Sequence, residues 1–150
     1  MKNLKLLSLF AVLILLGCNG DDDNRNDITL SGEWKLIEVN GTIAGIRHLF
    51  VPGIIKWNFN TSNHTFTVVN NNTDETKQDV LESGTYTYSI EGNDATPELC
   101  NQTLVLDGTN YGCYSMTTTT LQINQGEADG IIIKLIRYKT SFISKNKLYS

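Results

Sequence analysis

Beyond an N-terminal stretch, the chain consists of short segments in which apolar and polar side chains alternate. In one of them Ile55, Trp57 and Phe59 alternate with Lys56 and Asn58, which gives one apolar and one polar face. No long window holds the 3.6-residue period of an amphipathic helix. We therefore predict an all-β protein with eight strands, which include residues 30–39, 55–59, 64–68, 86–90, 104–106, 111–116, 121–123 and 131–138.

Clusters of Asn, Asp, Ser and Gly separate these segments, as at residues 60–63 and 107–108. Such residues tolerate positive φ or bond their own backbone, so they predict tight turns between antiparallel neighbours. Eight such strands can close into an up-and-down antiparallel barrel, because closure removes the exposed sheet edges. The apolar connection at residues 40–53 is the exception. We expect it to fold over the barrel as a lid, with one helical turn at residues 45–50.

The first residues have the pattern of a secretory signal. Two lysines precede an apolar run at residues 6–16, which is too short to span a bilayer as a mature helix. The run ends in Leu15-Leu16-Gly17-Cys18, which resembles the lipobox of bacterial lipoproteins. The resemblance implies that residues 1–17 are removed, that Cys18 is acylated, and that the mature protein is anchored in the bacterial outer membrane. The alternative is a secreted protein with an unpaired Cys18 thiol.

Residues 19–27 are polar and lack apolar side chains, so with Cys18 they predict a flexible acidic tether, residues 18–27. The run Asp21-Asp22-Asp23 resembles the acidic export signal of surface lipoproteins, which makes cell-surface exposure a hypothesis. Calcium is an alternative for this run, although a flexible chain lacks the enclosing ligands that calcium requires. Residues 28–140 then form one domain, followed by a polar tail at residues 141–150.

The charge of the chain excludes one class of partner. The formal net charge is −4, and removal of residues 1–17 leaves 10 basic and 16 acidic residues, a net charge of −6. A nucleic-acid partner would need a basic surface, so none is expected. We expect a monomer.

Two cysteines remain for the domain. Cys100 and Cys113 are predicted to form a disulfide, since the protein leaves the cytoplasm. The closed loop would contribute about 3 kcal/mol of stability by the chain-entropy model. A zinc or redox pair is the alternative, but there is no Cys-x-x-Cys and only two histidines accompany the cysteines. No metal is expected.

Gly32-Glu33-Trp34 in the first predicted strand and Arg137 in the last resemble the Gly-x-Trp motif and the covering Arg of the lipocalins, including the shortened lipocalin-like domains of bacterial lipoproteins. The resemblance implies that Arg137 covers Trp34 at the closed end of the barrel, while Gly32 lets the chain pass close beneath it. The family's C-terminal helix is not expected, because residues 140–150 are polar.

An eight-stranded barrel can either be filled by side chains or hold one small ligand, and the sequence leaves both open. The predicted inward faces include Ile90. The candidate ligand-binding residues on those faces are Trp57, Phe59, Phe66, Val68, Tyr86 and Tyr88.

Catalysis is not expected. His48 and His64 are the only histidines, most acidic residues fall in turns or in the tether, and no glycine-rich phosphate loop is present. His64 falls in a strand pattern, where it could equally be a wall residue. No cofactor is expected either. Two functions remain open: a membrane-anchored, lipocalin-like carrier of a small apolar ligand, and a packed barrel that acts as a surface interaction or inhibitor module.

Overall fold

The computed structural model describes residues 28–41, 45–94, 96–126 and 130–138. Every regular element in these ranges is a β-strand, which confirms the predicted all-β class. None of the described residues forms a helix with the length and apolar character needed to cross a membrane. The strands are β1 (Gly32–Gly41), β2 (Arg47–Leu49), β3 (Ile55–Asn60), β4 (Thr65–Asn70), β5 (Gly84–Gly92), β6 (Gln102–Leu106), β7 (Thr109–Met116), β8 (Thr120–Asn124) and β9 (Ile131–Ile136).

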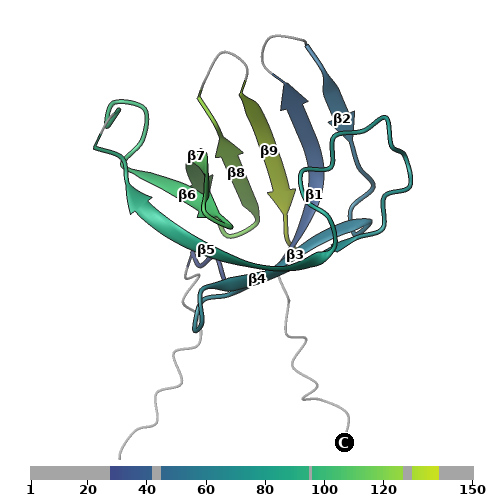
Figure 1. Cartoon of the computed structure of the whole chain (residues 1–150), viewed down its shortest axis with the longest axis horizontal. Coiled ribbons are helices and arrows are strands. Elements are labelled where there is room, and N and C mark those ends of the chain that lie inside the picture. Colours follow the sequence, from purple (N-terminus) through teal and green to yellow (C-terminus); the bar gives the residue numbers. More distant parts are fainter. Residues whose placement is uncertain (1–27, 42–44, 95, 127–129, 139–150) are drawn as a thin grey trace, which may run out of the picture.

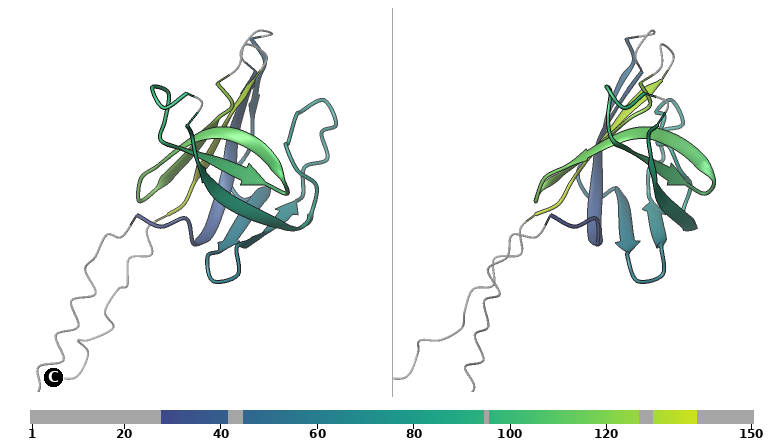
Figure 2. Two further views of the ribbon diagram at one scale, coloured as in Figure 1. Left: turned by 60° about the vertical axis from the view of Figure 1, so that its left-hand side comes forward. Right: turned by 90° about the vertical axis from the view of Figure 1, so that its left-hand side faces the viewer.

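Eight of these strands form the predicted closed barrel. Each strand from β3 to β9 pairs antiparallel with the next, and β9 returns to β1, whose other edge pairs with β3 (Figure 1). The strands β5 and β7 curve strongly around the molecule (Figure 2). Closure gives each of these eight strands a partner strand on both sides.

The ninth strand, β2, corrects one prediction. Residues 45–50 form no helical turn, because residues 47–49 pair with residues 38–40 of β1. At these positions the other edge of β1 is occupied by β9, so β2 lies on the same edge as β3. It therefore continues the ladder of β3 along β1, after an interruption at residues 50–54. The predicted lid is instead an extension of the barrel wall.

The interior of the barrel is a continuous apolar core. It consists of Leu30, Trp34, Leu36, Val39, Phe50, Ile55, Trp57, Phe59, Phe66, Val68, Tyr88, Leu104, Leu106, Leu121, Ile123, Ile133 and Leu135. Most strands supply every second residue to it, as their alternation predicts. In β1 the pairing with β9 shifts between Leu36 and Glu38. This β-bulge brings Val39 into the core three residues after Leu36.

Two residues depart from their predicted positions in the strands. His64 precedes β4 in an exposed turn with φ 56°, where its ring lies 5.8 Å from that of Tyr88. Ile90 pairs with Leu104 on the inner face, yet it remains 41% exposed, since the end of β5 extends beyond the packed interior.

The barrel is closed at one end by Trp34 and Arg137. The Arg137 guanidinium lies 4.3 Å from the centre of the Trp34 ring and donates hydrogen bonds to the backbone oxygens of Thr118 and Ser31. The buried indole N–H of Trp34 donates to Leu30 O at 2.8 Å. Burial lowers the pKa of Arg137. Arg137 follows the end of β9 rather than lying within it.

Gly32 contributes to this end for a different reason from the one expected. A side chain at this position would meet no atom within 4 Å, so close approach does not require glycine. Glycine is instead required by the backbone conformation, because Gly32 has φ +103° and residues with a Cβ rarely adopt this value.

Candidate functional site

The four candidate ligand-binding residues on β3 and β4 pack against one another inside the barrel. Trp57, Phe59, Phe66 and Val68 are at most 2% exposed. The rings of Phe59 and Phe66 stack with centroids 4.9 Å apart, and Trp57 lies 5.5 Å from Phe66. In this conformation these side chains contact protein on all sides and form the aromatic centre of the core.

One polar atom in this aromatic centre has no partner. The indole Nε1 of Trp57 is buried and makes no hydrogen bond with the described part of the chain. Its paired neighbours on the inner face are Trp34 on β1 and Val68 on β4, and neither side chain has a hydrogen-bond acceptor. A buried donor without an acceptor destabilises a fold by about 1–3 kcal/mol.

The two candidate tyrosines on β5 lie differently. Tyr88 is 6% exposed, and burial raises its pKa. Tyr86 is only partly buried and packs on the core, with its hydroxyl donating to Glu82 O at 3.0 Å. Tyr86 therefore links the core to the connection between β4 and β5.

Tyr111 lies near Tyr86. The pKa of Tyr111 is raised by burial and, to a smaller extent, by Tyr86 and Asp107. Val80 and Leu81, from the β4–β5 connection, also pack on the core while remaining partly accessible. We call Val80, Leu81, Tyr86 and Tyr111 the rim. Unlike the aromatic centre, the rim combines apolar contact area with polar groups that solvent can reach, which is the composition of many ligand sites.

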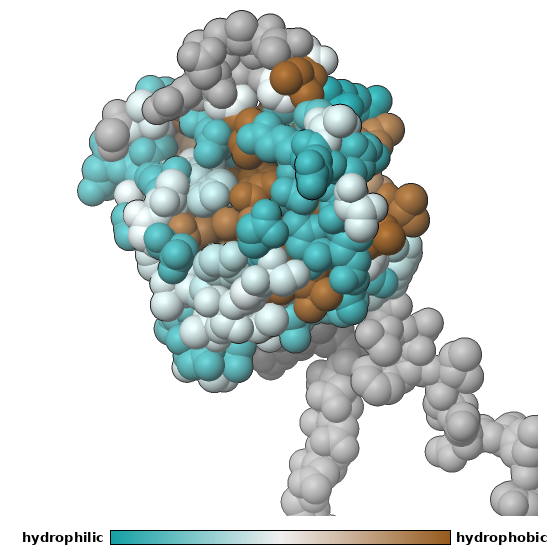
Figure 3. Space-filling view, turned by 45° about the vertical axis from the view of Figure 1, so that its right-hand side comes forward, coloured by the Kyte–Doolittle hydropathy of each residue, from teal (hydrophilic) through white to brown (hydrophobic). Residues whose placement is uncertain are grey.

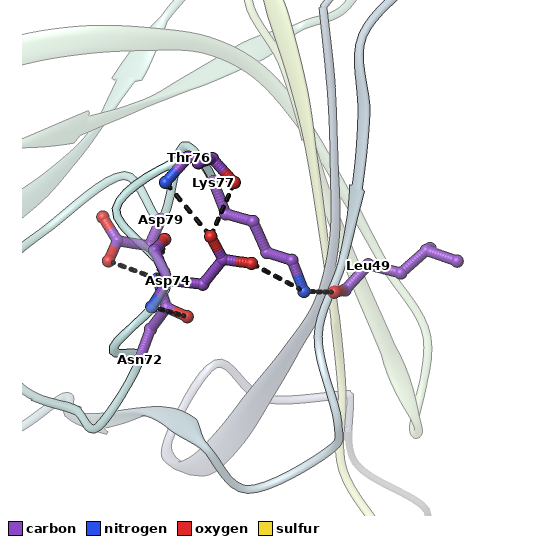
Figure 4. Close-up of polar contacts among 6 residues, drawn as sticks. All are labelled: Leu49, Asn72, Asp74, Thr76, Lys77 and Asp79. Atoms are coloured by element: carbon purple, nitrogen blue, oxygen red, sulfur yellow. Dashed lines mark hydrogen bonds and ion pairs between the residues drawn. The ribbon is translucent and has the colours of Figure 1, made fainter.

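Residues 71–83 form the connection that carries half of the rim. Figure 4 shows the polar contacts within it and its contact with Leu49 of β2, and Asn70 links it to β4. Lys77 Nζ donates to Leu49 O at 3.1 Å and lies 3.8 Å from Asp74 Oδ2. Asp79 Oδ2 accepts hydrogen bonds from the side-chain amides of Asn70 and Asn72. Because several of these groups are exposed, water can replace their contacts at a small cost.

The same connection contains an unusual backbone conformation. Val80 has φ 75°, and the N–H of Leu81 donates to Asp79 O at 3.0 Å across it. These features describe a γ-turn with a β-branched residue at a positive φ, which is strained. The turn directs Val80 and Leu81 onto the core, so strain is retained where the rim closes over the interior.

Apolar side chains also reach the outer surface. In Figure 3, apolar residues lie in the middle of the face and at its edge, surrounded by hydrophilic ones. Exposed aliphatic residues occur around β2, β3 and β4, with Ile46, Leu49, Val51, Ile54 and Val69 between 37% and 70% exposed. Single exposed apolar residues are normal on a protein surface. A group of them around β2 and residues 50–54 is a candidate contact surface.

Cys100 and Cys113 form the predicted disulfide. It joins the β5–β6 connection to β7, with a Cα–Cα distance of 5.8 Å. The Asn93 side-chain amide donates to Thr96 O and Cys100 O, which orders the same connection.

Beside the disulfide lies a pocket of about 580 Å³ outside the barrel wall, which we call the outer pocket. Thr103 belongs to its floor. It pairs with Cys113 on the face opposite the core, yet it is only 7% exposed. The lining of the outer pocket includes Asn93, Leu99, Thr103, Asn110, Cys113 and Gln125.

Several of these features were missed by the sequence analysis. Tyr111 and Tyr114 both pack on the core although they are three residues apart, because the pairing of β6 and β7 shifts around Gly112, which has φ +88°. A glycine within an otherwise alternating segment was the available signal. The outer pocket had no such signal, since its lining comes from distant connections.

The remaining candidates can be placed briefly. No group of three or more His, Cys, Asp or Glu side chains that could hold a metal occurs within the described ranges. Cys18 and residues 21–23 lie outside those ranges, as do the signal, the tether and the polar tail. Comparison of the chain with protein-family models, curated proteins and solved structures finds no match.

Proposed function

We propose that this protein is a lipocalin-like lipoprotein of the bacterial outer membrane whose barrel binds a small apolar molecule carrying one hydrogen-bond acceptor. The closed eight-stranded barrel is compatible with such a role, because barrels of this size are wide enough to hold one small ligand. The role requires no catalysis, no cofactor and no nucleic acid, and a monomer suffices for it.

The observation that carries the proposal is the unpartnered Nε1 of Trp57. An acceptor on a bound molecule would satisfy this donor and recover most of the free energy that it costs when unpaired. The surrounding aromatic and aliphatic side chains would contact the rest of the molecule. The chemistry of these side chains therefore matches a ligand that is apolar except for a carbonyl or an ether oxygen.

Access to Trp57 requires a change at the rim, because the aromatic centre is filled in the conformation described. We propose that the ligand displaces Val80 and Leu81 and takes their place on the core. Two features support this: the strained γ-turn at Val80 and the exposed polar contacts that hold residues 71–83. Movement of this connection would release the strain at Val80 and would break the part-buried hydrogen bonds that the Asn70 amide donates to Asp79 and Leu81.

The ligand proposal predicts a selective effect of Trp57→Phe. We expect the protein to bind two environment-sensitive dyes, the ketone 6-propionyl-2-(dimethylamino)naphthalene and the carbonyl-free N-phenyl-1-naphthylamine. Trp57→Phe keeps an aromatic ring but removes the N–H, so affinity for the ketone should fall about tenfold while affinity for the second dye stays constant. Fluorescence titration measures both affinities, in protein carrying Cys18→Ser so that no acyl chain competes.

Trp34→Phe is the matched control, since the Trp34 N–H is already bonded to Leu30 O and should not discriminate between the dyes. Equal loss of both dyes in Trp57→Phe would contradict the hydrogen bond. Failure of both dyes to bind the parent protein would contradict the carrier function itself.

The membrane anchor predicts a defined N-terminus. We expect mass spectrometry of the mature protein to identify Cys18 as the first residue, modified by diacylglycerol and an amide-linked chain. Several acyl chains give stable membrane residence, because each buried methylene contributes about 0.8 kcal/mol. Cys18→Ser should therefore move the protein from the membrane fraction to the soluble fraction, whereas an unmodified Cys18 would refute the anchor.

A second candidate function is a packed-barrel interaction module. The filled aromatic centre and the exposed aliphatic residues around β2 favour it. This candidate predicts that neither dye binds and that Leu49→Ser and Val51→Ser abolish crosslinking to a partner on intact cells. Its exposed surface lies on residues 46–54, so the two functions can be separated by mutation.

A further inference from the structure

Three rings form a row across the inner faces of β3, β4 and β5. Phe59 pairs with Phe66 across β3 and β4, and Phe66 pairs with Tyr86 across β4 and β5. Neighbouring centroids lie 4.9 Å and 5.4 Å apart, and the ring planes are inclined by only 15° and 30°. The adjacent rings of Trp57 and Tyr88 are inclined more steeply to Phe66, by 44° and 71°. The three rings therefore form a nearly parallel stack, which we call the aromatic row.

Tyr86 is the member of the aromatic row to which a further ring can be added. Phe59 and Phe66 are at most 2% exposed, whereas Tyr86 is only partly buried. Strand β6 ends at Leu106, which pairs with Tyr88, so the row stops at Tyr86 and does not continue onto β6. The row is therefore closed by packing at Phe59 and accessible at Tyr86.

The orientation of the Tyr86 ring depends on Gly84. Gly84 stands two residues before Tyr86 in β5, on the same face of the strand. A Cβ at position 84 would lie 3.1 Å from the Tyr86 hydroxyl oxygen and 3.2 Å from two carbons of the ring. The ring thus occupies the space of the side chain that Gly84 lacks, while its hydroxyl donates to Glu82 O at 3.0 Å. These contacts hold the ring in place before a ligand arrives, which lowers the entropic cost of stacking on it.

Tyr86 also lies close to the unpartnered donor. The Trp57 and Tyr86 rings lie beside the same ring, with centroids 5.5 Å and 5.4 Å from that of Phe66. A molecule of two fused rings with a carbonyl group at one end has the length needed to reach both residues.

We propose that the ligand of the barrel is a planar aromatic molecule, that Tyr86 selects it by stacking, and that Gly84 positions the Tyr86 ring. This inference rests on the proposed carrier function and specifies the class of its ligand. A flat ring gains the stacking interaction in addition to apolar contact, whereas a flexible aliphatic chain gains the contact alone. Tyr86 therefore favours flat ketones over aliphatic ketones with the same acceptor.

Isothermal titration calorimetry with two ketones tests the proposal. The planar 6-propionyl-2-(dimethylamino)naphthalene and the flexible 2-decanone are titrated into protein carrying Cys18→Ser. Tyr86→Leu removes the ring, so affinity for the planar ketone should fall about fivefold while affinity for 2-decanone stays constant. Tyr86→Phe keeps the ring and should retain both affinities. Binding of 2-decanone also shows that each variant is folded.

Gly84→Ala tests the positioning of the ring. The added methyl group displaces the ring, so this variant should show the same selective loss of the planar ketone as Tyr86→Leu. Combined with Tyr86→Leu, it should cause no further loss. Tyr114→Leu is the matched control, because Tyr114 is also a partly buried tyrosine on the core but lies on β7, outside the aromatic row. It should leave the ratio of the two affinities unchanged.

The outcomes separate this inference from the carrier function. An equal effect on both ketones in Tyr86→Leu, or the same selective loss in Tyr114→Leu, would overturn the stacking role of Tyr86 and leave the carrier function intact. If neither ketone bound the parent protein, the carrier function would be wrong, and the inference with it.

Discussion

Trp34→Ala is expected to lower the free energy of unfolding by about 4 kcal/mol, the largest effect among the substitutions considered. The indole is fully buried, so its removal leaves a large cavity at the closed end of the barrel. It also leaves Leu30 O without its donor and the partly buried Arg137 without the ring on which it stacks. Urea denaturation followed by the fluorescence of the remaining Trp57 measures the loss.

Two further variants separate the contributions at this end. Trp34→Phe retains a ring beneath Arg137, so it should destabilise less than Trp34→Ala. Arg137→Lys keeps the charge but loses the planar group, and it should cost about 1 kcal/mol. If Trp34→Ala cost no more than Arg137→Lys, Trp34 would not be the plug of the barrel.

Replacement of both Cys100 and Cys113 by Ser is expected to lower the free energy of unfolding by about 3 kcal/mol. The two cysteines are 13 residues apart, and removal of the disulfide opens the loop of residues 100–113 in the unfolded chain, which raises the conformational entropy of the unfolded state. The native strand pairing around Thr103 should persist, because β6 also pairs with β5. Thermal unfolding by circular dichroism, in a Cys18→Ser background that prevents thiol exchange, measures the change.

Reduction of the Cys18→Ser protein with dithiothreitol provides the control. It should reproduce the midpoint of the double Ser variant, since both lack the same crosslink. A double variant as stable as the parent would show that other contacts already order this connection.

The strands could be predicted from the sequence because their alternation is local. Trp57 and Phe59 are two positions apart in β3, as are Phe66 and Val68 in β4. All four side chains are buried inside the barrel. Closure of the barrel followed from the number of strands and the short turns between them. The disulfide followed from the number of cysteines together with the predicted export signal.

Features set by distant contacts could not be predicted in this way. β2 has no apolar period and exists because β1 extends beyond β3 and offers it a partner. Whether the interior was filled depended on how rings from several strands fit together, which a pattern of single positions does not contain. The outward turn of His64 reflects backbone geometry at the start of β4.

In the candidate site, too, the residues set by local alternation could be predicted and those set by distant contacts could not. Tyr86 was recognised because it belongs to an alternating strand, whereas Tyr111 was missed as a ligand-site residue because a shift in strand pairing accompanies it. Val80 and Leu81 lie in a polar connection, where two apolar residues give little sign that they pack on the core. The lack of an acceptor for Trp57 could be found only with coordinates.

The contact between Arg137 and Ser31 brings the two ends of the described domain together, at a distance of 3.0 Å from Nη1 to O. A short linker could therefore join residue 138 to residue 28 without crossing the barrel. New termini could then be opened in the exposed turn at residues 60–64, between β3 and β4. The permuted chain would form the same barrel, since the order of the strands around the barrel axis does not depend on where the chain begins.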